Sequence, residues 1–343
     1  MEAVMSGSAT ALVLGATGGI GGEAARLMLA RGWRVRALHR HPEKVASTLQ
    51  GLDWRRGDAL DAGSVLSAAD GVDVILHGVN PPGYRRWAEL VLPMIDASVA
   101  AARATGARLV LPGTIYNFGP DAGTMLMEEA PQNPVTEKGR IRVALEDRIR
   151  LLADGGGRAL ILRAGDFFGP RAGNSWFAQG MVQAEWPIRA ITLPGRPGIG
   201  HQWAYLPDLA ETMMALLDRE ADLPSFARFH FAGHWDADGM GMAEAIRRVT
   251  GRPDLPVKRL NWPLVRLAGL VMPMMREIAG MRYLWQQPLR MPGERLSAFL
   301  GDVPHTDLDR AVAETLAGLG CLPGQELSAG GRHLLSGGGR SPA

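Results

Sequence analysis

Cysteine and lysine are the scarcest reactive residues in this chain of 343 residues. The single cysteine, Cys321, excludes an internal disulfide framework and any zinc site built from several thiolates. Lysine occurs only at Lys44, Lys138 and Lys258, so 34 of the 37 basic residues are arginines, which stay charged at every physiological pH. This composition suits a reducing cytoplasm, and the lysines are few enough to consider one by one.

The chain also lacks an excess of charge of either sign. Its 37 basic and 35 acidic residues give a net charge of +2 and are interleaved, so we expect no nucleic-acid partner. No basic residue precedes Arg26, so the start of the chain lacks the charged region of a secretory signal. The eight histidines are scattered, with no pair of metal-binding spacing on a helix, and we expect no metal site.

Long hydrophobic runs are absent as well. The most hydrophobic later stretch, residues 264–275, is interrupted by Arg266 and Pro273 and is too short to span a bilayer. We therefore expect a cytoplasmic protein without a membrane partner, and a core or subunit-interface helix over this stretch.

Short apolar runs alternate with helical patterns through the first half of the chain. Strands are predicted at residues 10–15, 34–38, 52–55, 73–76, 108–111 and 159–162. Helices are predicted at residues 19–31, 63–69, 85–104 and 138–153. The alternation predicts an α/β protein, with a Rossmann-like doubly wound parallel sheet that is covered by helices on both faces.

After residue 163 this regularity ends, and proline, glycine and tryptophan become frequent between residues 169 and 203. Irregular segments of this kind often carry substrate contacts. We expect a nucleotide-binding domain over 8–170, to which about 201–235 returns, and a smaller C-terminal substrate-binding lobe from 171–200 and 236–325. The glycine- and serine-rich end, 326–343, is predicted to be a disordered tail.

A glycine-rich turn lies between the first predicted strand and the first predicted helix. Gly15 suits a tight turn, Gly18 lets a pyrophosphate approach the backbone, and Gly21 lets the helix pack closely on the strand. The helix N-terminus then offers N–H groups to phosphates. The alternative is a tight turn without a ligand. The predicted dinucleotide site consists of Gly15, Thr17, Gly18, Gly19, Ile20 and Gly21.

The end of the second predicted strand indicates which nucleotide is bound. An acid about 20 residues after the glycine turn would hold the ribose of NAD, but His39 and Arg40 occupy that place. Arg40 and Lys44, with Arg36 nearby, can pair with a 2′-phosphate, which favours NADP(H) over NAD(H); a solvated basic face is the alternative. Asp58, after the third strand, can accept from the adenine amino group or cap the next turn.

The G-x-x-G-x-x-G spacing of the turn resembles that of the short-chain dehydrogenase/reductase superfamily. Further segments resemble its extended branch, the NAD-dependent epimerase/dehydratase group, over about residues 10 to 250. The resemblance implies that Gly78 and Asn80 lie against the cofactor and that Thr114 stands where the family has its catalytic Ser/Thr. These segments follow one another in the family's order: 57–58, 76–80, 111–119, 162–170 and 203–210.

The family's Tyr-x-x-x-Lys pair is missing from this sequence. In the family, the tyrosine exchanges the proton, while the lysine lowers the tyrosine's pKa and holds the nicotinamide ribose. None of the four tyrosines here is followed four residues later by lysine. At the corresponding place we align Lys138 with the tyrosine and Arg142 with the lysine, one helical turn apart.

Two hypotheses follow from this pair. In the first, the protein is an NAD(P)-dependent oxidoreductase or epimerase that acts on a small molecule and uses NADP(H). Arg142 then holds the ribose, and Lys138 donates the proton because desolvation and the neighbouring guanidinium lower its pKa. Thr114 binds a substrate oxygen, and Tyr116 is either a substitute donor or a buried aromatic.

In the second hypothesis, the protein is a catalytically silent NADP(H)-binding redox sensor that contacts a partner protein. Lys138 and Arg142 are then ion-pair partners of Glu137 and Glu146 on a solvated helix. The family's habit also implies a homodimer, formed through the predicted helices at 85–104 and 138–153.

Overall fold

The computed structural model describes residues 8–81 and 86–322 of the chain. The predicted tail at 326–343 and Tyr84 lie outside the described residues. Within the described part, no helix is both long and apolar enough to cross a membrane.

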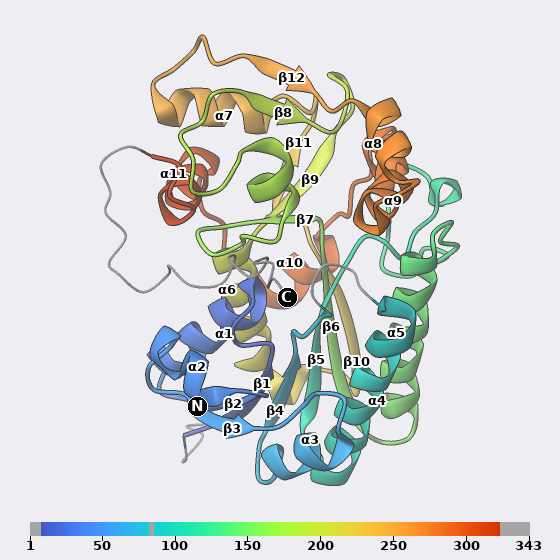
Figure 1. The fold of residues 1–343 in the computed structure, drawn as a ribbon. Coiled ribbons are helices and arrows are strands. Elements are labelled where there is room, and N and C mark those ends of the chain that lie inside the picture. Colours follow the sequence, from blue (N-terminus) through green and yellow to red (C-terminus); the bar gives the residue numbers. More distant parts are fainter. Residues whose placement is uncertain (1–7, 82–85, 323–343) are drawn as a thin grey trace, which may run out of the picture.

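A seven-stranded sheet forms the centre of the nucleotide-binding half, with every neighbouring pair of strands parallel (Figure 1). The strand order is β10-β6-β5-β4-β1-β2-β3. The strands are β1 (Thr10–Leu14), β2 (Arg34–His39), β3 (Asp53–Arg56), β4 (Val74–His77), β5 (Arg108–Gly113), β6 (Arg158–Ala164) and β10 (Phe226–Phe231). The predicted doubly wound parallel sheet is therefore confirmed.

Helices cover both faces of this sheet (Figure 1). One layer contains α1 (Gly19–Ala30) packed against α6 (Leu206–Leu217), and the other contains α3 (Ala62–Ala68), α4 (Trp87–Thr105) and α5 (Glu137–Asp154). A short helix, α2 (Pro42–Val45), follows β2. The layers form because the central strands are buried on both faces: all residues of β1, β4 and β5 are buried.

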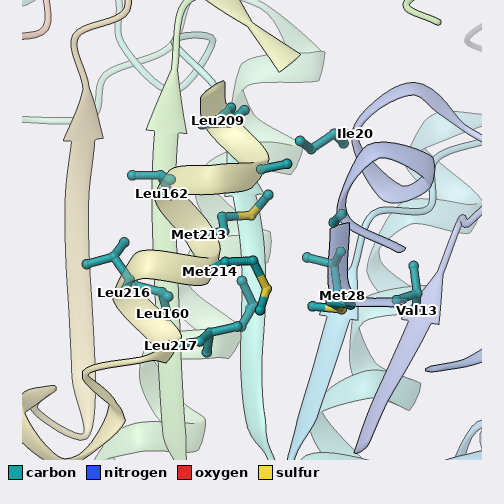
Figure 2. Packing of buried hydrophobic residues seen from close by; sticks show 14 of the residues in the cluster. Val13, Ile20, Met28, Leu160, Leu162, Leu209, Met213, Met214, Leu216 and Leu217 are labelled. Atoms are coloured by element: carbon teal, nitrogen blue, oxygen red, sulfur yellow. The ribbon is translucent and has the colours of Figure 1, made fainter. Parts of the chain in front are cut away.

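The core between the sheet and the α1/α6 layer explains why α6 belongs to this half. Leu209, Met213 and Leu216 of α6 lie in one buried cluster with Leu160 of β6 and Met28 of α1 (Figure 2). Burying such side chains removes apolar area from water and holds α6 against the helix that starts at the glycine turn.

The remaining elements form a second group beside the C-terminal edge of the strands (Figure 1). It contains a three-stranded sheet of order β11-β9-β7 and a pair formed by β12 and β8. The strands are β7 (Asp166–Phe168), β8 (Ile191–Leu193), β9 (His201–Tyr205), β11 (His234–Asp236) and β12 (Val257–Arg259). The helices of this group are α7 (Gly241–Thr250), α8 (Trp262–Ala268), α9 (Pro273–Gly280) and α11 (Leu308–Gly318), whereas α10 (Glu294–Leu300) packs against β10 of the seven-stranded sheet.

The stretch at 264–275 differs from the predicted core helix. It contains two short helices, α8 and α9, whose joint exposes Leu270 by 74% and Val271 by 81%. Pro273 starts a new helix in place of continuing α8, because proline suits a first helical turn and breaks an interior one. The prediction of a core helix was therefore wrong, whereas its alternative, a helix in a subunit interface, stays a prediction.

Candidate functional site

The glycine turn has the shape that a bound dinucleotide requires. Gly15 adopts a φ of +91°, and its carbonyl accepts a hydrogen bond from the Gly18 N–H at 2.9 Å. A Cβ on Gly21 would lie 2.3 Å from the Gly15 oxygen, so only glycine permits this close contact between helix and turn. No side chain caps the N-terminus of α1, which leaves its first N–H groups directed at the turn. These residues fit the pyrophosphate of a dinucleotide.

Thr17 and Gly18 are exposed at this turn, while Ile20 is buried and anchors the start of α1. Gly78, after β4, lies directly under the turn: a Cβ on Gly15 would lie 2.6 Å from the Gly78 oxygen. The predicted cofactor residues at the ends of β1 and β4 are thus neighbours, as adjacent parallel strands require.

The end of β2 carries exposed basic side chains. Arg40 and Lys44 are exposed, and neither forms an ion pair within the part of the chain that the structure describes. Arg56, which sequence reasoning missed, donates to the Arg40 carbonyl at 3.2 Å and to Glu43 at 2.9 Å. His39 is half-buried beside them, and its Nδ1 accepts from the His41 N–H at 3.0 Å.

Two other residues that were considered at this end have local partners. Arg36 donates to the carbonyls of Ala68 and Asp70 and lies 3.7 Å from Asp53, so it faces α3 and the neighbouring strand. Asp58 accepts from the Leu60 N–H at 3.0 Å, which is the turn-capping alternative considered for it.

Lys138 is the central residue of the site. It lies in the first turn of α5 with only 3% of its surface exposed. Its Nζ lies 4.8 Å from the centre of the Trp87 ring and 4.7 Å from that of Tyr116, and it donates to the Met281 sulfur at 3.6 Å. Aromatic faces stabilise an ammonium group only in part, so burial dominates its chemistry.

This burial lowers the pKa of Lys138 to about 7, against 10.5 for an ordinary lysine. Desolvation is the largest cause, and the nearby positive charge of Arg142 adds to it; Glu277 and Asp166 act in the opposite direction. A lysine with this pKa exchanges its proton near neutral pH, as a general acid must.

Arg142 lies one turn further along α5 and is also buried, with 7% of its surface exposed. Its Nη2 donates to Asn80 Oδ1 at 2.8 Å, and its guanidinium lies 5.0 Å from the Trp87 ring centre. The structure therefore joins two residues that were predicted separately, Arg142 and the cofactor residue Asn80.

The helix face that carries Lys138 and Arg142 is buried, not solvated as the sensor hypothesis supposes. Lys138 and Arg142 are buried, and Glu146 makes a buried ion pair with Arg163, whose Nη2 lies 2.5 Å from Glu146 Oε2. The physical reason is that β6 places Arg163 under α5, where its fixed charge pairs with the Glu146 carboxylate.

A chain of hydrogen bonds joins Tyr116, Asp166 and His201 beside Lys138. The Tyr116 hydroxyl donates to Asp166 Oδ1 at 3.4 Å, and Asp166 Oδ2 lies 2.8 Å from His201 Nε2. The His201 ring stacks on Trp285 with 3.6 Å between ring centres. Asp166 and His201 are buried, and sequence reasoning assigned no catalytic role to Asp166.

Thr114 follows β5 directly and is half-buried. Its Oγ1 accepts from the Tyr116 N–H at 3.4 Å, a local contact that fixes the loop carrying Tyr116. Thr114, Tyr116 and Lys138 thus come from the carboxyl end of β5 and the start of α5, the edge of the sheet where α/β folds bind their ligands.

Asp208 belongs to a separate cluster beyond this site. It lies inside the first turn of α6, which begins at Leu206. Its carboxylate accepts from the N–H and the hydroxyl of Thr306, at 2.7 and 2.6 Å. A carboxylate oxygen of Asp208 and one ring nitrogen each of His234 and His305 lie within 4.8 Å of one another. The two hydrogen bonds from Thr306 indicate that Asp208 fastens the segment before α11 to α6.

Comparison with known proteins extends this description. Residues 15–145 match a family model described as NAD(P)H-binding. The chain is 29% identical over 180 residues to dTDP-6-deoxy-L-talose 4-dehydrogenase (NAD(P)(+)) of Kitasatospora kifunensis, covering 49% of this chain and 56% of that protein. It is 44% identical over 70 residues to sterol demethylase protein B of Methylococcus capsulatus, covering 20% and 21%. The chain thus spans about half the length of the first of these relatives and less of the second.

Among solved structures, UDP-glucuronic acid 4-epimerase from Bacillus cereus in complex with NAD matches with a TM-score of 0.70. The match covers 90% of this chain and 98% of that chain at 15% sequence identity. At this identity the likeness establishes the fold.

Proposed function

From the premise that residues 15–145 are an NAD(P)H-binding domain within an extended short-chain dehydrogenase/reductase fold, we propose that this protein is an NAD(P)-dependent oxidoreductase or epimerase. Its substrate is a small molecule with a carbonyl or an oxidisable hydroxyl group. The observation that carries this proposal is the burial of Lys138 between Trp87 and Tyr116, with a pKa lowered to about 7.

The residues divide the work of carbonyl reduction. A nicotinamide cofactor, when bound, supplies the hydride that adds to the carbonyl carbon. The ammonium of Lys138 donates a proton to the carbonyl oxygen, so that an N–H bond breaks as the O–H bond forms. The Thr114 hydroxyl holds that oxygen, and Arg142, oriented by Asn80, contacts the ribose. In the oxidative direction, the neutral amine of Lys138 takes the proton back.

Tyr116 is the second proton donor that we considered, and its contacts favour a supporting role. Its hydroxyl is already directed to Asp166, while its ring lies below the Lys138 amine. We propose that Tyr116 and Asp166 position Lys138 and that Lys138 exchanges the proton.

We further propose NADP(H) as the cofactor. Arg40 and Lys44 supply unpaired positive charge at the end of β2, and Arg56 braces the Arg40 backbone from β3. An arginine can donate two parallel hydrogen bonds to the oxygens of a 2′-phosphate. The single hydroxyl of an unphosphorylated ribose cannot accept such a pair.

Replacing Arg40 with alanine is expected to weaken NADPH binding by about tenfold to a hundredfold, the usual range for losing a charge-assisted hydrogen bond, and to leave NADH binding nearly unchanged. Fluorescence titration of the purified protein with both nucleotides measures this. Arg34→Ala, at the opposite end of β2, is the matched control and should bind both nucleotides normally. Equal losses for NADH and NADPH in Arg40→Ala would refute the proposed 2′-phosphate contact.

The substrate is best sought with a panel of carbonyl compounds and NADPH oxidation as the readout. The names of the two relatives suggest that nucleotide-linked keto sugars and sterol ketones belong in that panel. Turnover of any of them supports the oxidoreductase. Tight NADPH binding without turnover across the panel would favour the silent sensor.

A further inference from the structure

The end of α8 and the turn that connects it to α9 expose a cluster of large apolar side chains. We call Leu264, Leu267, Leu270, Val271 and Met272 the apolar tip. Their exposed fractions run from 46% for Met272 to 81% for Val271, which is the most exposed large hydrophobic residue in the described part of the chain. Scattered apolar residues on a surface are normal, but a contiguous cluster marks a site of interaction.

The helix α8, which carries part of the apolar tip, is packed on the protein through its opposite face. Trp262 and Val265 are buried in the core of the C-terminal half, and the Trp262 indole N–H donates to the Pro194 carbonyl at 2.8 Å. The helix is therefore anchored through one face, while Leu264 and Leu267 on the other face are 60% and 63% exposed. Such a division is typical of a helix that lies in an interface.

Basic side chains are frequent in the segment that carries the apolar tip and in the residues that flank it along the chain. Lys258, Arg259, Arg266 and Arg276 are exposed, and Arg282 is half-exposed. None of these five forms an ion pair with an acidic side chain among the described residues.

Negative charge is nearly absent from the same segment. Between residues 257 and 285 the only acid is Glu277. Glu277 is half-buried, and its negative charge raises the pKa of Lys138. Its charge therefore acts on the candidate site. The segment that carries the apolar tip therefore has an excess of positive charge, in a protein whose overall charge is only +2.

We propose that the apolar tip inserts into the headgroup region of an anionic membrane, with the surrounding basic residues paired to lipid phosphates. Exposed apolar residues framed by arginine and lysine match such a surface in both hydrophobicity and charge. We prefer a membrane to a second copy of this chain as the partner, because a second copy would bring the same positive charges close together. The attachment is peripheral and is consistent with the lack of a spanning helix. It departs from the expectation of a protein without a membrane partner, because that expectation rested on the lack of a hydrophobic stretch long enough to span a bilayer.

The attachment would place the site close to the membrane. Residues 281–285 follow α9 immediately, and among them Met281 contacts the Lys138 amine while Trp285 stacks on His201. A lipid-soluble substrate could then reach the site without crossing water. This last consequence rests on the proposed function, whereas the attachment itself does not.

Vesicle flotation with the full-length protein tests the attachment. We expect the protein to float with vesicles that contain phosphatidylglycerol, to stay behind with vesicles of phosphatidylcholine alone, and to be released by high salt. The double variant Leu270→Glu/Val271→Glu should lower the bound fraction by about tenfold or more. Leu151→Glu changes an apolar residue on α5 that is 64% exposed, and it is the matched control that should bind normally.

Three outcomes would overturn the proposal. The first is a wild-type protein that floats with neither type of vesicle. The second is a double variant that floats as well as the wild type. The third is a wild-type protein that is a dimer in analytical ultracentrifugation and does not bind vesicles, together with a double variant that is a monomer. That result would make the apolar tip a subunit interface. NADPH binding by the double variant checks that it is folded and is independent of all three.

Discussion

Replacing Lys138 with methionine is expected to lower the turnover of a carbonyl substrate by about a hundredfold to ten-thousandfold, the range for losing a general acid. Methionine keeps the volume of the lysine stem between Trp87 and Tyr116 and removes only the proton-carrying amine. NADPH affinity should change little, because the glycine turn and the end of β2 do not involve this residue. Steady-state turnover and nucleotide titration on the same preparation measure both quantities.

The composition of the chain offers matched controls for this variant. Lys258→Met removes an exposed lysine that has no proposed contact with the cofactor, and it should leave turnover unchanged. Tyr116→Phe removes the hydroxyl that donates to Asp166 and should slow turnover less than Lys138→Met. If Tyr116→Phe proves inactive while Lys138→Met retains full turnover, the tyrosine is the acid and the proposed role of Lys138 is wrong.

Replacing Arg163 with methionine is expected to lower the free energy of unfolding by about 3–5 kcal/mol, the range for removing one partner of a buried ion pair. The Arg163 side chain is fully buried, and it donates from Nε and Nη2 to the two oxygens of Glu146, at 3.0 and 2.5 Å. Its Nη1 also donates to the Glu128 carbonyl at 3.2 Å. The variant would leave the Glu146 carboxylate buried without its guanidinium partner.

Urea denaturation followed by circular dichroism measures this change. The double variant Arg163→Met/Glu146→Leu removes both charges and should recover much of the lost stability, since paired replacement by apolar residues is often nearly neutral. Arg150→Met, on the exposed side of α5 in an ion pair with Asp154, is the surface control and should alter stability by less than about 1 kcal/mol. An Arg163→Met variant as stable as this control would contradict the account of the buried pair.

The sheet of the nucleotide-binding half could be predicted because its strands carry the signal in their own residues. β1 and β4 are short, wholly buried apolar runs, and each is followed by a glycine or a helix start. The helix α6 was harder, since its place depends on packing against α1. The joint at 264–275 was misjudged because hydrophobicity alone does not distinguish a buried helix from an exposed apolar surface.

The site could be predicted where a motif fixed the spacing. Lys138 and Arg142 were found because a helical turn separates them at the place of the family's catalytic pair, and Asn80 because it follows a strand in a recognisable segment. Trp87, Asp166 and Met281 were missed, since they meet Lys138 or Tyr116 only after distant parts of the chain fold together. No local pattern of residues encodes such a contact.

The titration of Lys138 tests the central claim of this account most directly. With only three lysines, a protein labelled with ¹³C at the lysine side chains gives three ε-carbon signals, and Lys138→Met assigns the one of interest. The structure predicts that Lys138 titrates near pH 7, so reduction should slow and oxidation should quicken as the pH rises through that value. Lys44 and Lys258, both exposed, serve as the internal reference. A Lys138 signal that titrates near the ordinary value of 10.5 would contradict the proposal that this lysine is the proton donor.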